Sequence, residues 1–130
     1  MIVVDSSAIV AYLQDEPEAA EFRDILYSAG RILMSAVNVF ECRMVLNGRL
    51  GDAAVARFDA LAAEVGIEIV PFDQDQSRLA FEAHRRFGRG SGHAARLNMG
   101  DCAAYALAAS RGLPLLFKGG DFAATDVRRP

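Results

Sequence analysis

The chain has 130 residues, of which 52% are hydrophobic and 24% charged, and its formal net charge is −3. This length suits one domain of about 100–150 residues, and the apolar content excludes a chain that is disordered throughout. The sequence contains neither the roughly 18–20 consecutive apolar residues of a membrane span nor a signal peptide. We therefore expect a single domain over residues 1–130, located in the cytoplasm, with Cys42 and Cys102 as buried thiols.

Hydrophobic periodicity divides the chain into alternating strands and helices. Short β-branched runs predict strands, and apolar residues at every third or fourth position predict helices. The predicted strands are residues 2–4, 32–35, 67–70 and 115–117, and the predicted helices are residues 8–13, 17–28, 37 to 48–51, 52–65, 75–87 and 101–110. This alternation indicates an α/β fold in which a mainly parallel sheet of four to five short strands carries helices on both faces.

Some helix features can be tested in detail. Pro17 stands where the first residue of the second helix is expected. The long helix carries Val37, Phe40 and Met44 at helical spacing, which predicts that they form its buried face. The two earliest helices have more apolar side chains than a small sheet face must bury. Some of these are expected to line a groove for a partner helix, unless all lie in the core: Ile9, Leu13, Phe22 and Leu26.

Four acidic residues are predicted to meet at one edge of the sheet, because ligands bind beyond the C-terminal ends of parallel strands. Asp5 ends the first strand, and Glu41 lies about one and a half turns into the helix after the second. Asp101 begins the last helix, and Asp121 follows the last strand. Asp101 alone would also suit a helix N-terminus as a charge that favours the helix dipole. Gathered carboxylates repel unless a cation bridges them, and all-oxygen ligands select Mg²⁺ or Mn²⁺ over Zn²⁺.

A basic segment without acidic residues separates Glu82 from Asp101. Its glycines would allow a close approach to a polynucleotide strand, and its arginines are expected to contact phosphates. A solvated, flexible loop is the alternative. Lys118 is expected either to contact a phosphate as well or to form an ion pair. The candidate phosphate-binding residues are thus Arg85, Arg86, Arg89, Arg96 and Lys118.

The four acidic segments together resemble those of PIN-domain ribonucleases, and their order and spacing are most similar to the VapC toxins of bacterial VapBC toxin–antitoxin modules. The resemblance covers essentially the whole chain. Phe117-Lys118 departs from the Thr or Ser that many PIN domains carry before the fourth acid, so Asp126 is a second candidate for the role of Asp121. The segments are IVVDSSAIVAYL, SAVNVFECRMVL, LNMGDCAAYALA and PLLFKGGDFAATDV.

The resemblance implies a PIN-like three-layer α/β/α sandwich and a Mg²⁺- or Mn²⁺-dependent endoribonuclease that cuts single-stranded or loop RNA. Asp5 and Asp101 would bind the metal, Glu41 would be a ligand or position the attacking water, and Asp121 would complete a second metal position. Ser6 or Ser7 would orient these acids, cap the first helix, or do both. The implied partners are a cognate VapB-type antitoxin and a second copy of the chain.

Two other functions compete with this interpretation. A receiver-like phosphoacceptor module also combines clustered aspartates, Mg²⁺ and a lysine after a strand. Against it, Asp5 is followed by Ser6-Ser7 rather than by a second acid, and Glu41 would have no role. A PIN-like binding protein without catalytic activity is the third possibility, and the presence of all four acids argues against it.

Overall fold

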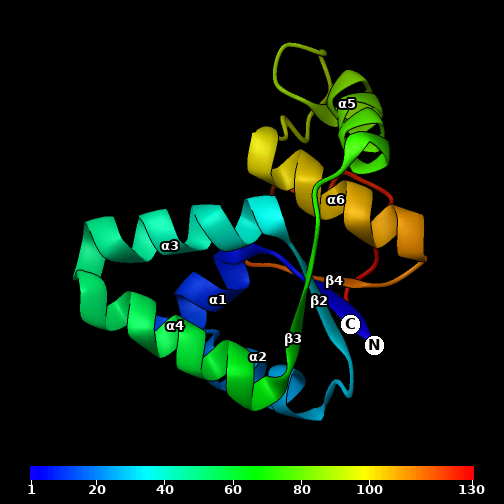
Figure 1. Ribbon diagram of the computed structural model, residues 1–130. Coiled ribbons are helices and arrows are strands. Elements are labelled where there is room, and N and C mark those ends of the chain that lie inside the picture. The colour runs from blue at the N-terminus through cyan, green and yellow to red at the C-terminus, as the bar shows by residue number, and fades with distance from the viewer.

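A computed structural model describes residues 1–130 and contains four strands and six helices (Figure 1). The strands are parallel and lie in the order β3-β2-β1-β4. The predicted α/β class is confirmed, and the sheet has four strands. No helix is both long and apolar enough to cross a membrane. The elements are β1 (Ile2–Val4), α1 (Ser6–Leu13), α2 (Ala19–Ser28), β2 (Ile32–Ser35), α3 (Ala36–Leu50), α4 (Asp52–Val65), β3 (Ile67–Val70), α5 (Gln74–Phe87), α6 (Met99–Arg111) and β4 (Leu115–Leu116).

Two hydrophobic cores lie on opposite faces of the sheet. Along β1, Ile2 and Val4 pack in the core shared with α1 to α4, whereas Val3 packs in the core formed with α5 and α6. Side chains alternate in this way because successive residues of a strand point to opposite faces. Figure 1 shows α1 to α4 gathered on one side of the sheet and α5 and α6 on the other. This is the expected three-layer α/β/α sandwich.

Polar side chains start the two helices that border the acidic edge. The Asp5 carboxylate accepts a hydrogen bond from the backbone N–H of Ser7 at 3.0 Å, so Asp5 is the N-cap of α1 and the helix begins at Ser6. The alternative that Ser6 or Ser7 caps this helix is therefore wrong. Asn98 caps α6, and its backbone and side chain exchange hydrogen bonds with Asp101 in a capping box.

Pro17 does not begin the second helix, contrary to the prediction. Helix α2 starts at Ala19, and its N-cap Glu18 makes no side-chain capping hydrogen bond. The residues between α1 and α2 form turns, and the φ of Asp15, 53°, is in the left-handed region. Pro17 belongs to this turn segment, and the helix starts two residues later.

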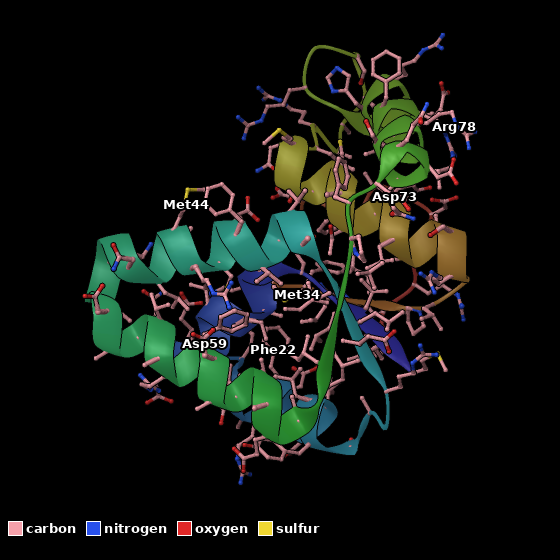
Figure 2. All side chains as sticks on the ribbon, viewed as in Figure 1. Phe22, Met34, Met44, Asp59, Asp73 and Arg78 are labelled. Carbon is pink, nitrogen blue, oxygen red and sulfur yellow. The ribbon has the colours of Figure 1, made fainter.

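The buried face of α3 also differs from the prediction. Val39 and Cys42 are buried, whereas Phe40 and Met44 are 63% and 53% exposed. Figure 2 shows Met44 on the side of α3 that is turned away from α4. The helix carries two apolar stripes, and packing on α1 and α4 decides which one is buried.

The four side chains expected to line a groove on the early helices belong to the core instead, and of these Leu13 borders a cavity, one of about 190 Å³ between α1, α2 and α4. Each of the four is at most 7% exposed, and all pack in the same cluster: Ile9, Leu13, Phe22 and Leu26. The two cysteines are free and buried, as predicted.

Candidate active site

The four predicted acids surround one cavity of about 370 Å³. We call it the acid cavity. Asp5 enters it from the end of β1, Glu41 from the second turn of α3, Asp101 from the first turn of α6, and Asp121 from the segment after β4. No three acidic, histidine or cysteine side chains close on one point as a ready ligand set. The structure thus brings together carboxylates that are up to 116 positions apart in the sequence.

The acid cavity holds carboxylates that burial and mutual repulsion make harder to ionise. The pKa of Asp5 is raised to about 7, mainly by burial and in smaller part by the Asp101 and Glu41 carboxylates. Burial also raises the pKa of Asp101 to about 6, with contributions from Asp121 and Glu41 in the same direction. None of the four acids takes part in a salt bridge. The nearest basic groups, Arg49 and Lys118 on the cavity wall and Arg89 near Asp101, therefore do not pair directly with these carboxylates.

This donor set fits a hard divalent cation. All four side chains offer oxygen, and neither histidine nor cysteine borders the acid cavity. Magnesium-like ions are held through one or two carboxylates and several waters, so an open cavity of this size suits them better than a closed cage. The positive charge of the ion would also relieve the repulsion that raises the two pKa values.

The two serines after Asp5 contact different parts of the site. The Ser6 hydroxyl donates a hydrogen bond to Oε1 of Glu41. The Ser7 hydroxyl accepts a hydrogen bond of 3.0 Å from the backbone N–H of Lys118. The first turn of α1 thereby touches both α3 and the segment that leads to Asp121.

Lys118 forms an ion pair, although not with Asp121. Its Nζ lies 2.6 Å from Glu16 and 3.3 Å from Glu18. The hydrogen bond to Glu16 raises the pKa of the ammonium group. Of the two roles left open by the sequence, the structure shows the ion pair.

The basic segment divides into two pairs of arginines. Arg89 and Arg96 line a second cavity of about 440 Å³, which we call the basic cavity and which shares Asp121 with the acid cavity. Neither forms a salt bridge. In contrast, Arg85 lies 3.5 Å from Glu82, and Arg86 stacks 4.6 Å above the Phe87 ring. Neither of these two lines the acid or the basic cavity.

Asp126 lies outside the acid cavity. Its carboxylate accepts a hydrogen bond from the Tyr105 hydroxyl and is 3.8 Å from Arg86. It connects the C-terminal segment to α5 and α6. Asp121, rather than Asp126, is the acid of this segment that borders the cavity.

Three further residues at the site were missed in the sequence. Asn98 could have been found, because an Asn three residues before an acid is a helix-start signal. Asn38 donates hydrogen bonds to Asp5 and to the backbone of Gly100, and it occurs in an apolar run that gives no sign of this. Glu16, which lines the acid cavity, has no local signal either.

We predict that replacement of Asp5 stabilises the metal-free protein at high pH. The folded-state pKa values of about 7 for Asp5 and 6 for Asp101 lie above the ordinary 3.8, so the folded state binds protons more tightly than the unfolded state. That advantage is lost as the pH rises from 4 to 8. Asp5→Asn keeps a capping side chain and should raise the Tm in EDTA by about 5 °C at pH 8, with little change at pH 4.

The exposed Asp24, replaced by Asn, serves as the control and should shift the Tm at neither pH. A Tm difference between Asp5→Asn and wild type that is the same at pH 4 and pH 8 would contradict the assigned cause. Added Mn²⁺ should raise the wild-type Tm more than that of Asp5→Asn, because an ion that binds only the folded state stabilises it.

Comparisons with known proteins identify the family. The PIN domain model matches residues 2–128. Ribonuclease VapC28 of Mycobacterium tuberculosis is 44% identical over 128 residues, which cover 98% of this chain and 96% of that protein. The crystal structure of Mycobacterium tuberculosis VapC20, described as a Sarcin-Ricin loop cleaving toxin, has a TM-score of 0.80 at 20% identity and covers 100% of both chains. VapBC2 from Rickettsia felis, solved with a DNA fragment from its promoter, has a TM-score of 0.77 at 12% identity, covering 100% of this chain and 98% of that one.

The identity to VapC28 extends over nearly the whole of both chains, and the two structures, although distant in sequence, have the same fold. The receiver-like alternative is not favoured. The chain belongs to the VapC ribonucleases of the PIN domain family.

Proposed function

We propose that this protein is a Mg²⁺- or Mn²⁺-dependent endoribonuclease, the toxin of a VapBC-type module, which hydrolyses phosphodiester bonds in single-stranded or loop RNA. The observation that carries the proposal is the acid cavity, where four carboxylates from distant segments meet and none of them forms a salt bridge. Family membership supports the same activity. Two free, buried cysteines suit a reducing cytoplasm as its location.

Asp5 and Asp101 would hold the cation, since they are the most deeply buried of the four acids. Asp121, which is exposed on the rim, would complete a second and weaker position. When bound, such an ion supplies an activated water nucleophile and neutralises charge on the phosphodiester. The preference for Mg²⁺ or Mn²⁺ follows from the all-oxygen donor set.

Glu41 would act as a ligand or as the base that receives the proton of the attacking water. The hydroxyl of Ser6 donates to its Oε1, which leaves Oε2 available as the proton acceptor. Ser7 would orient the site indirectly, because it holds the backbone of Lys118 three residues before Asp121.

Arg89 and Arg96 would bind the RNA backbone on either side of the phosphate that is cleaved. Both guanidinium groups border the basic cavity, next to Asp121, and both are without salt-bridge partners. Contacts to phosphates fix the register of a strand without reading its sequence. Arg85 and Arg86 interact within α5 and with the C-terminal segment, so we assign them a smaller part. Lys118 would contact a phosphate of the RNA only if the RNA displaced its ammonium group from Glu16.

A cognate VapB-type antitoxin would neutralise the enzyme. The solved relatives of this chain include toxin–antitoxin complexes, which supports such a partner. An arginine of the antitoxin could pair with the carboxylates of the acid cavity in place of the cation, because a guanidinium binds a carboxylate through two parallel hydrogen bonds.

A second copy of the chain would cover the exposed apolar face formed by α3, α5 and the start of α6. Phe40 and Met44 project from α3, Phe81 from α5 and Met99 from α6, and all four are exposed. A cavity of about 420 Å³ is lined by residues of these three helices, among them Val37, Phe81 and Met99. Exposed apolar side chains around an apolar cavity are typical of an association site, which supports a homodimer.

Replacement of the buried acids is expected to abolish cleavage without unfolding the protein. Asp101→Asn and Asp5→Asn should each lower the Mn²⁺-dependent cleavage rate at least about 100-fold. Mutation of residues that only orient metal ligands lowers activity by up to about 100-fold, and loss of a ligand itself should cost at least as much. EDTA should stop the wild-type reaction, and Mn²⁺ should restore it. The measurement is the cleavage rate of a fluorophore-labelled single-stranded RNA, with Asp24→Asn as the control. Full activity of purified Asp5→Asn would overturn the assignment.

The two pairs of arginines are expected to behave differently. Arg89→Gln with Arg96→Gln should weaken RNA binding and lower the slope of log affinity against log salt by about 1.4, since each phosphate contact on a single strand contributes about 0.7. Arg85→Gln with Arg86→Gln removes the same charge from the same segment and should leave the slope nearly unchanged. Fluorescence anisotropy in EDTA, from 50 to 300 mM salt, gives both slopes. Equal salt slopes for the two double variants would contradict the prediction, because they would show that arginines near the acid cavity contribute no more to RNA binding than the other pair.

Expression of the chain alone is expected to arrest growth. Co-expression of the small gene beside it in the genome should relieve the arrest and yield a co-purifying complex. Asp101→Asn should be harmless when expressed alone, because it lacks nuclease activity. The purified variant can also be used for light scattering, which should give twice the mass of one chain if the protein is a homodimer. A folded and active wild-type protein that is harmless alone and captures no neighbour would instead indicate a housekeeping nuclease.

A further inference from the structure

Asn38 occupies an unusual position at the centre of the molecule. It lies in the first turn of α3 and is completely buried. Its Nδ2 donates a hydrogen bond of 3.0 Å to the backbone carbonyl of Gly100 and lies 3.5 Å from Oδ1 of Asp5. One side-chain amide thus connects the end of β1 with the start of α6, the two segments that carry Asp5 and Asp101.

Packing alone does not explain an asparagine here. Its Oδ1 is the single buried side-chain oxygen or nitrogen atom in the protein without a hydrogen-bond partner. A buried acceptor that has lost water and gained no donor destabilises the folded state, and an apolar side chain would avoid this cost. The benefit of the residue must therefore come from the donor end of the amide.

Gly100 completes the contact between α3 and α6. Its carbonyl accepts the hydrogen bond from Asn38, and a methyl group at its Cα would overlap both carboxylate oxygens of Glu41. Asn38 and Glu41 are three residues apart, so they project from the same face of α3. Through these two side chains, α3 sets the distance between itself and the N-terminus of α6.

On the basis of the metal-dependent function above, we propose that Asn38 is a positioning residue, which holds the Asp5 carboxylate and the backbone that carries Asp101 at the separation that one divalent cation can bridge. Partners that orient metal-binding side chains contribute strongly to metal affinity although they do not touch the ion. Without the amide, Asp5 and the first turn of α6 lose their common anchor, and the repulsion between Asp5 and Asp101 favours their separation.

The test compares Mn²⁺ affinity with stability. Asn38→Ala should weaken Mn²⁺ binding by about 10-fold or more in isothermal titration calorimetry. Its Tm in EDTA should fall no further than that of a core truncation, because the cavity it leaves is offset in part by removal of the unpaired oxygen. Val39→Ala is the matched control from the same turn. It creates a cavity in the core and should lower the Tm without changing Mn²⁺ affinity.

Asn38→Leu provides a second variant should the alanine variant not fold. It fills a similar volume without a donor, so it should lose Mn²⁺ affinity as Asn38→Ala does. Mn²⁺ affinity within twofold of wild type in the folded variant would overturn the inference, as would an equal loss in Val39→Ala. Failure of the proposed function is a separate result: wild type and Asp5→Asn would then both show no Mn²⁺ binding, which would overturn this inference as well.

Discussion

Repulsion between carboxylates that are held out of water is the constraint on which this structure depends. Asp5 is 3% exposed and Asp101 8%, and neither forms a salt bridge within the protein. Helix dipoles reduce the free-energy cost of burying these two carboxylates. Asp5 caps α1, and Asp101 belongs to the capping box of α6, so each carboxylate lies at the positive end of a helix. The same hydrogen bonds that start these helices therefore keep the acids in the cavity.

Helix α3 packs against these capped helix ends. Helix α3 brings an amide and a carboxylate against the start of α6, and Gly100 leaves room for both. The other face of α3 carries Phe40 and Met44 to the surface. A single helix thus borders the acid cavity, the core and the exposed apolar face, which places the proposed dimer contact within one helix diameter of the proposed reaction centre.

Much of the fold could be predicted, because the strands are short apolar runs bounded by turn residues, and the acids occur where such runs end. Parallel strands bring those ends to one edge, so the meeting of Asp5, Glu41, Asp101 and Asp121 followed from the topology. The unpredicted features depend on contacts between distant elements. The buried stripe of α3 is selected by α1 and α4, and the division of the arginines depends on Asp126 and Glu82. Asn38 shows no pattern in the sequence, since its partners lie 33 and 62 positions away.

The order of the strands has a consequence for folding. β1 lies inside the sheet, between β2 and β4, although these two neighbours are separated from each other by two helical pairs and β3 in the sequence. The segment that carries Asp121 is fixed only after β4 has paired with β1 and Lys118 has bonded to Ser7. Before β4 has paired, the cavity lacks one of its walls. A partly folded chain in which β4 is still unpaired therefore cannot assemble the complete acid cluster.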